Sequence, residues 1–364
     1  KVNNTDVYDI ASLTKIVATL PNVMQEFDQG HLTLETKLKT MLPEAKNSNK
    51  ANATVLDMLT HQARFQPWIP FYKATLDSLN RPSTHFYRSE FSDEFPVHVA
   101  DKLYLRKNYN DTIVKTILDS ELLPKKQYKY SDFTFILFKE YLELHNKKSL
   151  EDLAHANFFE PLGANSIMYN PLRKMNANRI IPTENDNYFR HQIVQGYVHD
   201  MAAAMQGGIS GHAGLFANAL DVAKVMQMFL QKGSYGGRTY ISESTFNIFN
   251  TCYFCKDGNR RGVGFDKPQL GNEGPTCGCV SLTSFGHTGF TGTMTWADPE
   301  KEIVYVFLSN RTFPDSNATN KLSKEHPFSF YFEGNDFIYV LDRNEPRRVE
   351  FAKNWGMKDE TIID

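Results

Sequence analysis

The stretch that decides the fold is residues 10–30, IASLTKIVATLPNVMQEFDQG, in which apolar side chains recur at helical spacing. This period predicts an amphipathic helix that ends at Gly30, because glycine commonly follows the last helical turn. Ser12 and Lys15 lie near its start, three residues apart, a spacing that places two side chains on one helix face. We therefore expect a hydroxyl and an amine side by side at the beginning of a helix.

A serine beside a lysine suits nucleophilic chemistry. The hydroxyl needs a neighbour to remove its proton, and a lysine with an ordinary pKa of ~10.4 can do so only if burial or nearby cations lower that pKa. The first helical turn also leaves backbone N–H groups free to stabilise an oxyanion. Taken alone, however, Ser-x-x-Lys arises by chance in most chains of this size.

A second motif, Tyr130-Ser131-Asp132, lies between a basic loop and a segment, 134–145, whose period predicts a helix. Its Tyr and Asp could project from the loop into a cleft. The alternative is a tyrosine packed in the core and an aspartate that caps the helix.

A third motif, His287-Thr288-Gly289, lies in residues 283–311, which have the pattern of a hairpin of two buried strands joined by a turn at 298–301. The glycine would let a substrate backbone approach the strand edge closely. The alternative is a histidine at the start of a strand with ordinary turn glycines.

In this order the three motifs resemble the signature motifs of the serine β-lactamases and penicillin-binding proteins. The Tyr that opens the middle motif is similar to the branch of class C β-lactamases, D-alanyl-D-alanine carboxypeptidases and esterases. Four other segments resemble the β-lactamase-like module fused behind family 3 β-N-acetylglucosaminidases, namely 180–186, 195–200, 255–268 and 274–281. Further family-like segments are 56–61, 159–163, 214–216 and 221–224.

The resemblance implies an α+β fold of the β-lactamase/transpeptidase type, with an antiparallel sheet flanked by helices and a mostly helical subdomain. The active site would lie in the cleft between them. The expected parts are an α/β part (1–60 and 196–325), a helical subdomain (61–195) and a C-terminal tail (326–364) in which two strands could pair as an extra hairpin.

The family also places two strands before the helix with the serine, whereas only 11 residues precede Ser12. Those strands either lie outside this sequence or are replaced in the sheet by the hairpin of the tail.

The same resemblance implies roles for single residues. Ser12 would attack the substrate carbonyl, and Lys15 and Tyr130 would move its proton. The backbone N–H groups of Ser12 and Phe290 would form the oxyanion hole. The substrate-binding residues would be Asp132, His287, Thr288 and Gly289, with Thr288 helping to seat a substrate carboxylate.

Two positions depart from the family pattern. His287 stands where the family usually has lysine, and histidine is only partly charged at neutral pH. Asp132 stands where the family usually has asparagine, so an N–H donor is lost and a negative charge is added. We therefore do not expect efficient hydrolysis of β-lactams.

Four cysteines form two close pairs, Cys252-x-x-Cys255 and Cys277-x-Cys279. This spacing fits a structural four-thiolate zinc site, two disulfides, or four free thiols. In each case we expect a structural role, and catalysis itself requires no cofactor. Three histidines near family-like segments are assigned no catalytic role: His61, His199 and His212.

The composition excludes some classes of partner. A formal net charge of -2 offers no positive field for nucleic acid, and no run of 18 apolar residues predicts a membrane span. By resemblance the protein would be periplasmic or secreted, although no signal segment is visible, and a glycosidase domain could precede it. The leading hypothesis is a serine hydrolase that forms an acyl-enzyme on an amide, peptide or ester, with cell-wall fragments favoured. The alternative is a non-catalytic recognition or sensing module.

Overall fold

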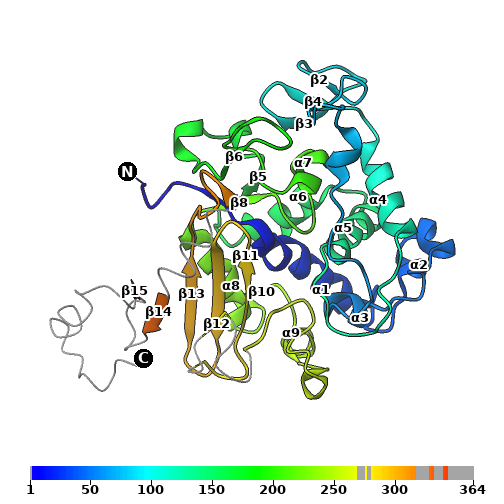
Figure 1. Cartoon of the computed structure of the whole chain (residues 1–364). Helices are drawn as coiled ribbons and strands as arrows, with labels where there is room; N and C mark the ends of the chain where they lie inside the picture. Colours follow the sequence, from blue (N-terminus) through cyan, green and yellow to red (C-terminus); the bar gives the residue numbers. More distant parts are fainter. Residues whose placement is uncertain (1, 269–274, 277–279, 317–327, 332–338, 343–364) are drawn as a thin grey trace.

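The computed structural model describes residues 2–268, 275–276, 280–316, 328–331 and 339–342 (Figure 1). The α-helices are α1 (Leu20–Asp28), α2 (Leu38–Met41), α3 (Val55–Leu59), α4 (Tyr109–Asp119), α5 (Phe133–Asn146), α6 (Leu150–Ala154), α7 (Met201–Met205), α8 (Ala219–Leu230) and α9 (Glu243–Asn250). The strands are β1 (Tyr8–Asp9), β2 (Tyr87–Arg88), β3 (Val97–Ala100), β4 (Leu103–Leu105), β5 (Met168–Tyr169), β6 (Glu184–Asp186), β7 (Gln192–Val194), β8 (Leu215–Ala217), β9 (Ser234–Tyr235), β10 (Arg238–Thr239), β11 (Phe285–Gly289), β12 (Thr293–Asp298), β13 (Ile303–Phe307), β14 (Phe328–Tyr331) and β15 (Tyr339–Asp342).

The N-terminal helix, residues 11–28, changes its pitch along its length. It opens with a 3₁₀ turn at Ala11–Leu13, widens to a π turn at Lys15–Thr19 and continues as α1. Gly30 has a φ of +75°, which confirms the glycine predicted at the end of this helix.

The main sheet of the described residues has three antiparallel strands in the order β11-β12-β13. The prediction of only two strands in 283–311 is wrong, because the chain reverses between β11 and β12 at Gly292, whose φ is +91°. Helix α8 packs against β12 and β13 (Figure 1). Helices and antiparallel strand pairs together confirm the α+β class.

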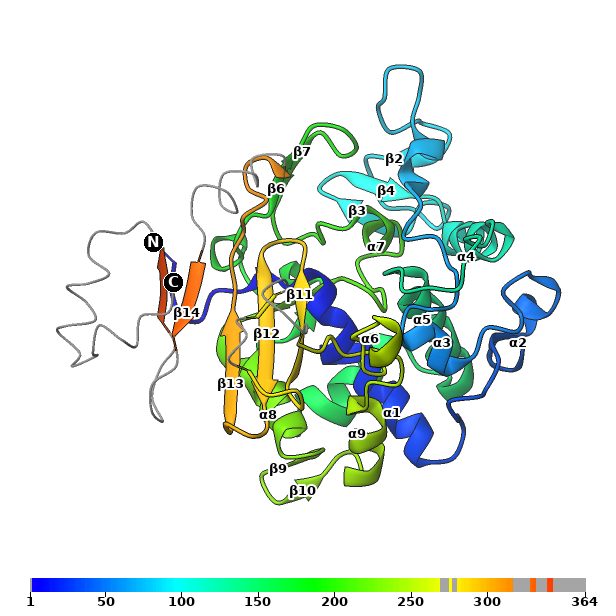
Figure 2. The same cartoon turned by 60° about the horizontal axis from the view of Figure 1, so that its bottom comes forward.

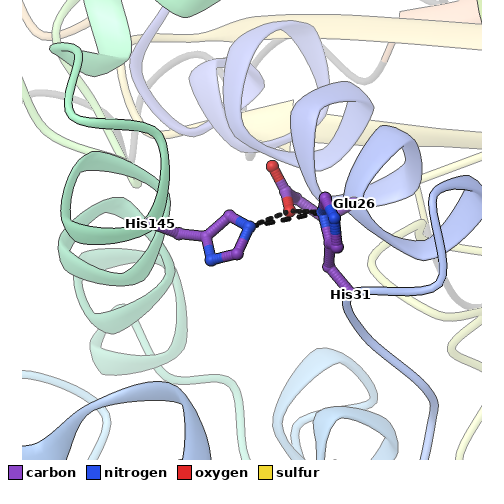
Figure 3. Close-up of side chains that lie close together, drawn as sticks. All are labelled: Glu26, His31 and His145. Carbon is purple, nitrogen blue, oxygen red and sulfur yellow. Dashed lines mark hydrogen bonds and ion pairs between the residues drawn. The ribbon is translucent and has the colours of Figure 1, made fainter.

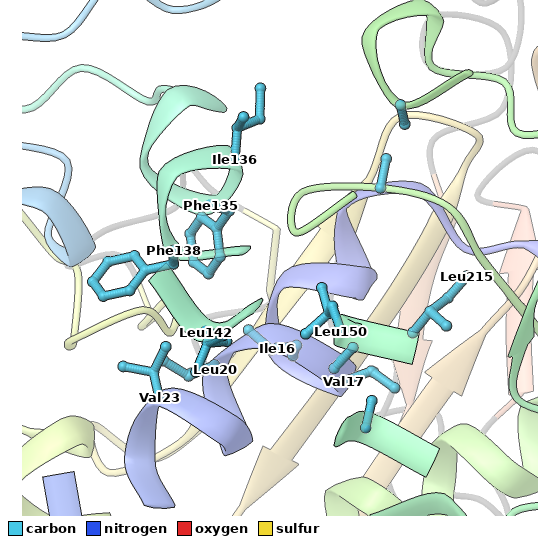
Figure 4. Close-up of a cluster of buried hydrophobic side chains, with 14 of the residues drawn as sticks. Ile16, Val17, Leu20, Val23, Phe135, Ile136, Phe138, Leu142, Leu150 and Leu215 are labelled. Carbon is cyan, nitrogen blue, oxygen red and sulfur yellow. The ribbon is translucent and has the colours of Figure 1, made fainter. Parts of the chain in front are cut away.

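The N-terminal helix lies between this sheet and a group of helices that includes α4 and α5 (Figures 1 and 2). Its apolar residues pack against α5, α6 and β8 in one continuous buried cluster (Figure 4). The labelled members of that cluster are Ile16, Val17, Leu20, Val23, Phe135, Ile136, Phe138, Leu142, Leu150 and Leu215. This packing fixes the helix on which Ser12 and Lys15 lie.

The region 64–107, which has no sustained period, contains a small antiparallel sheet in the order β2-β4-β3. In the tail, β14 pairs with β15, with Phe328 opposite Asp342. These two strands form a separate sheet, so the idea that the tail completes the main sheet is wrong.

Candidate active site

The three sequence motifs converge on the Ser12 hydroxyl. The Nζ of Lys15 lies 2.9 Å from Ser12 Oγ, and the Tyr130 hydroxyl donates to the same oxygen at 3.1 Å. Ser12 and Lys15 come from the first turns of the N-terminal helix, and Tyr130 comes from the loop before α5. A nucleophile with two proton-carrying neighbours within hydrogen-bond distance is the arrangement that acyl transfer requires.

Lys15 is completely buried and fully hydrogen-bonded. Besides Ser12 Oγ, its Nζ contacts Asp132 Oδ1 at 2.8 Å and donates to the backbone oxygen of His212 at 3.1 Å. The ammonium also lies 5.0 Å from the centre of the Tyr130 ring. Asp132 thus pairs with the lysine, and it lines the cavity next to the serine groove together with Trp68.

These contacts decide the protonation states. Burial by itself lowers the pKa of Lys15, but the charges and hydrogen bonds of Asp132 and Tyr130 together outweigh burial, and the pKa of Lys15 is raised. Burial also raises the pKa of the Tyr130 hydroxyl. The resting site therefore holds an ammonium and a neutral phenol, which is the opposite of the lowered lysine pKa that the sequence argument required.

His287, on β11, is 2% exposed and its Nδ1 donates to the backbone oxygen of Thr288 at 2.7 Å. Burial, followed by the positive charges of Arg261 and Lys15, lowers the pKa of His287 well below its usual range. The expectation of a partly charged histidine at neutral pH is therefore wrong, because the ring is buried among cations.

Gly289, at the end of β11, lies directly against the start of the N-terminal helix. A Cβ there would come within 2.1 Å of Thr293 Oγ1 and 2.8 Å of the Ile10 backbone oxygen. The glycine thus lets the protein's own backbone approach, whereas the sequence alone led us to expect the approach of a substrate. Because Phe290 comes next, its backbone lies beside the first residues of the helix.

A groove of about 580 Å³ opens over these groups. Its lining includes Ser12, Tyr130, His287, exposed Thr288 and Phe290. The structure therefore gathers the expected site residues along one groove, with Asp132 behind Lys15 in the neighbouring cavity.

The same groove is lined by three arginines that were not predicted from the sequence: Arg260, Arg261 and Arg311. Arg261 is 4% exposed, pairs with Asp266 at 3.7 Å and lies over the Tyr130 ring at 5.3 Å. Its Nε and Nη1 have no hydrogen-bond partner among the described residues. The lining of the groove thus includes permanent positive charge close to the serine, and two N–H groups of Arg261 are buried without a partner among the described residues.

Comparison with known proteins gives the family. The model of the family described as "Beta-lactamase" matches residues 1–326. The chain belongs to the β-lactamase family. A putative D-alanyl-D-alanine carboxypeptidase of Escherichia coli K12 is 27% identical, over 93% of this chain and 78% of the relative. An N-acetylmuramyl-L-alanine amidase of Bacillus subtilis is 28% identical, over 85% of this chain and 69% of the relative.

Solved structures agree on the fold of this β-lactamase family member. A penicillin-binding protein from Bacillus halodurans aligns with a TM-score of 0.58 at 14% identity, over 89% of this chain and 86% of the other. A D-stereospecific amidohydrolase from a Streptomyces species also gives 0.58 at 14% identity, over 88% and 87%. The family match and the named relatives confirm a serine hydrolase, whose chemistry needs no cofactor, and give no support to a non-catalytic module.

The histidines near family-like segments have structural partners. The Nδ1 of His61 accepts a hydrogen bond from the Ser131 N–H at 3.2 Å, which fixes the loop that carries Tyr130. The His212 ring lies 2.8 Å from both Ser210 Oγ and Asp200 Oδ1. The backbone N–H of His199 donates to Asp9 at 2.6 Å.

Of the three alternatives for the cysteines, the four-thiolate zinc site is wrong. Cys252 and Cys255 are joined in a disulfide, which removes both thiolates from any metal site. Cys277 and Cys279 lie outside the described residues. Among the residues that the structure describes, no helix has both the length and the apolar character needed to cross a bilayer.

Proposed function

We propose that Ser12 is the acyl-accepting nucleophile and that the substrate is an amide or peptide with a free carboxylate. The observation that carries the proposal is the contact of two proton carriers, Lys15 Nζ and Tyr130 OH, with the Ser12 oxygen at the edge of an arginine-containing groove. The nucleophile, its proton carriers and a group that fits the substrate's charge are then all present.

In the acylation step, Lys15 in its neutral form accepts the proton of Ser12. The Ser12 Oγ–carbon bond forms, the carbonyl carbon–nitrogen bond breaks, and Tyr130 passes a proton to the leaving amine and regains one from Lys15, which carries the proton of Ser12. The backbone N–H groups of Ser12 and Phe290 stabilise the oxyanion. Water then releases the acyl group from Ser12.

Asp132 is assigned a positioning role in place of direct substrate binding. Its carboxylate holds Lys15 at 2.8 Å and raises the pKa of that lysine.

The substrate carboxylate is assigned to Arg261 and the hydroxyl of Thr288. Arg261 lines the groove and keeps its charge at all working pH values, whereas neutral His287 offers no charge. Arg260 and Arg311 add to the attraction from the groove lining.

Cell-wall peptides are the favoured substrate class, because the curated relatives are named as a carboxypeptidase acting on D-alanyl-D-alanine and an amidase of N-acetylmuramyl-L-alanine. A periplasmic or secreted location and an adjoining glycosidase domain belong to the same proposal. Fractionation of the source cells and the sequence of the complete gene test these two points.

The decisive experiment is intact-mass analysis after exposure to an activated ester and, separately, to a β-lactam. We expect one acyl group per chain, on the peptide that contains Ser12. The Ser12→Ala variant should lose both adduct and turnover, while the surface control Ser244→Ala keeps both. An adduct that persists in Ser12→Ala with full turnover would overturn the proposal. Comparing an acyl-D-alanyl-D-alanine with its C-terminal amide then tests whether a free carboxylate is required.

A further inference from the structure

A second group of chemically active side chains lies away from the serine groove. Glu26 near the end of α1, His31 just after it and His145 in the last turn of α5 point toward one another (Figure 3). Glu26 Oε2 lies 2.8 Å from His31 Nδ1 and 3.4 Å from His145 Nε2, and the two nitrogens are 3.3 Å apart.

The helix ending builds the first pair. The His31 N–H donates to the Glu26 backbone oxygen at 2.9 Å, the Gly30 N–H donates to that of Phe27 at 3.0 Å, and Gly30 is left-handed. This is a Schellman ending, in which the residue after the glycine regularly touches the residue five positions earlier, most often through apolar side chains. Here that contact consists of an imidazole and a carboxylate.

The third side chain is also held in place. The His145 ring stacks on that of Tyr141, with centroids 5.5 Å apart and planes at 22°. Asn146 donates to the other Glu26 oxygen, Oε1, at 2.8 Å. The carboxylate is therefore anchored on one oxygen and presents Oε2 to the two histidines.

We propose that Glu26 Oε2, His31 Nδ1 and His145 Nε2 bind one Zn²⁺ ion. Tetrahedral zinc with bonds of about 2.0–2.1 Å separates its ligand atoms by about 3.3–3.4 Å, and two of the three edges here already have that length. Two nitrogens and one carboxylate oxygen are ligands that zinc accepts. Glu26 is buried, whereas the histidine side chains are 43% and 40% exposed, so water can complete the coordination.

The ion would act as a structural link between two helices that serve the active site. The N-terminal helix carries Ser12 and Lys15 at its start and Glu26 near its end, and α5 follows Asp132 and carries His145 in its last turn. The 14 residues of α5 span about 20 Å, which separates the ion from the reacting serine. Zinc should therefore stabilise the fold without taking part in hydrolysis.

Calorimetric titration of the untagged, metal-free chain with ZnCl₂ tests the proposal. We expect one equivalent to bind with micromolar or tighter affinity, and to raise the melting temperature. His31→Gln and His145→Gln should each weaken binding at least about tenfold and abolish the rise in melting temperature, whereas the exposed control His155→Gln should bind like the parent. Absence of micromolar binding in the parent, or parental binding in both variants, would overturn the site.

Cobalt(II) separates this site from the cysteines. Bound Co²⁺ should give visible bands of four- or five-coordinate geometry, without the near-ultraviolet absorption of a cobalt–thiolate bond, and His145→Gln should lose the bands. A thiolate band would assign the metal to cysteine and contradict the proposal. Circular dichroism of the metal-free variants checks the fold, and Glu26→Gln, which retains the shape of the buried side chain, provides a third variant.

Discussion

The Nζ of Lys15 lies 2.8 Å from Oδ1 of Asp132, with the ammonium completely buried and the carboxylate side chain 24% exposed. The same nitrogen is the nearest proton carrier to the Ser12 hydroxyl. The acid therefore sets the protonation state of the group on which activation of the serine depends.

Asp132→Asn should move the pH dependence of hydrolysis toward lower pH. Lys15 accepts the serine proton only in its neutral form, so the rate rises as pH passes through the pKa of Lys15. Asp132 raises that pKa, and its removal should lower the midpoint of the rise by about 1–3 units. The profile of kcat/KM for a neutral ester measures the shift. An unchanged midpoint would separate Asp132 from the activation of Ser12.

Arg261→Lys should weaken recognition of the substrate carboxylate. Lysine keeps the charge that faces Asp266 but lacks the planar guanidinium with several donors, so KM for a carboxylate-bearing substrate should rise roughly 10- to 100-fold. The kcat/KM for its neutral ester should change little. Arg238 stacks on Tyr240 outside the groove, so Arg238→Lys is the matched control. Equal losses on both substrates would indicate a general distortion of the groove.

Gly289→Ala should disturb the junction between β11 and the N-terminal helix. The added methyl would meet Thr293 Oγ1 and the Ile10 oxygen, and overpacking of this kind costs about 1–3 kcal/mol of unfolding free energy. Because the junction positions Phe290, kcat should fall as well. Adding Thr293→Ala removes the closer contact and should restore part of the stability. Denaturant unfolding and ester kinetics measure both effects, and a stable, fully active Gly289→Ala variant would contradict this account.

Lys267→Met should change how stability depends on pH. Lys267 is buried, with Nζ donating to Asn250 Oδ1 and the Thr283 oxygen, and burial lowers its pKa from 10.5 to about 7. Between these values the unfolded chain holds a proton that the folded chain has lost. The stability of the parent should therefore rise with pH, by up to about 1.4 kcal/mol per pH unit from this group.

The methionine variant lacks this contribution. The difference in unfolding free energy between parent and variant should shift in favour of the parent by about 2–3 kcal/mol between about pH 7.5 and about pH 9.5. A constant difference over that range would show that Lys267 keeps its ordinary pKa in the fold.

Local spacing predicted the contact between Ser12 and Lys15 but not the other contacts of the site. Ser12 and Lys15 share a helix turn, so their contact follows from a separation of three residues. Tyr130 is 118 residues from Ser12, and only the family resemblance connected them. The pairing of Asp132 with Lys15 and the position of Arg261 depend on tertiary packing, which the doublet Arg260-Arg261 alone does not reveal.

The elements of the fold were also predicted only in part from the sequence. Periodicity located the N-terminal helix and α5, because both have apolar residues at helical spacing. It missed α4, although the buried residues Ile113, Val114 and Ile117 have helical spacing. The turn between β11 and β12 was hidden because aromatic and β-branched residues on both sides of Gly292 read as one strand.

The π turn at Lys15–Thr19 changes the direction, around the helix axis, in which the side chains of the N-terminal helix point. Each π turn contains more residues than an α turn, so the side chains beyond it are rotated relative to those before it. The face that presents Ser12 and Lys15 is thereby uncoupled from the face that Leu20 and Val23 bury in the core. Deleting one residue within this turn would restore a uniform pitch, and one of the two faces would then point in the wrong direction.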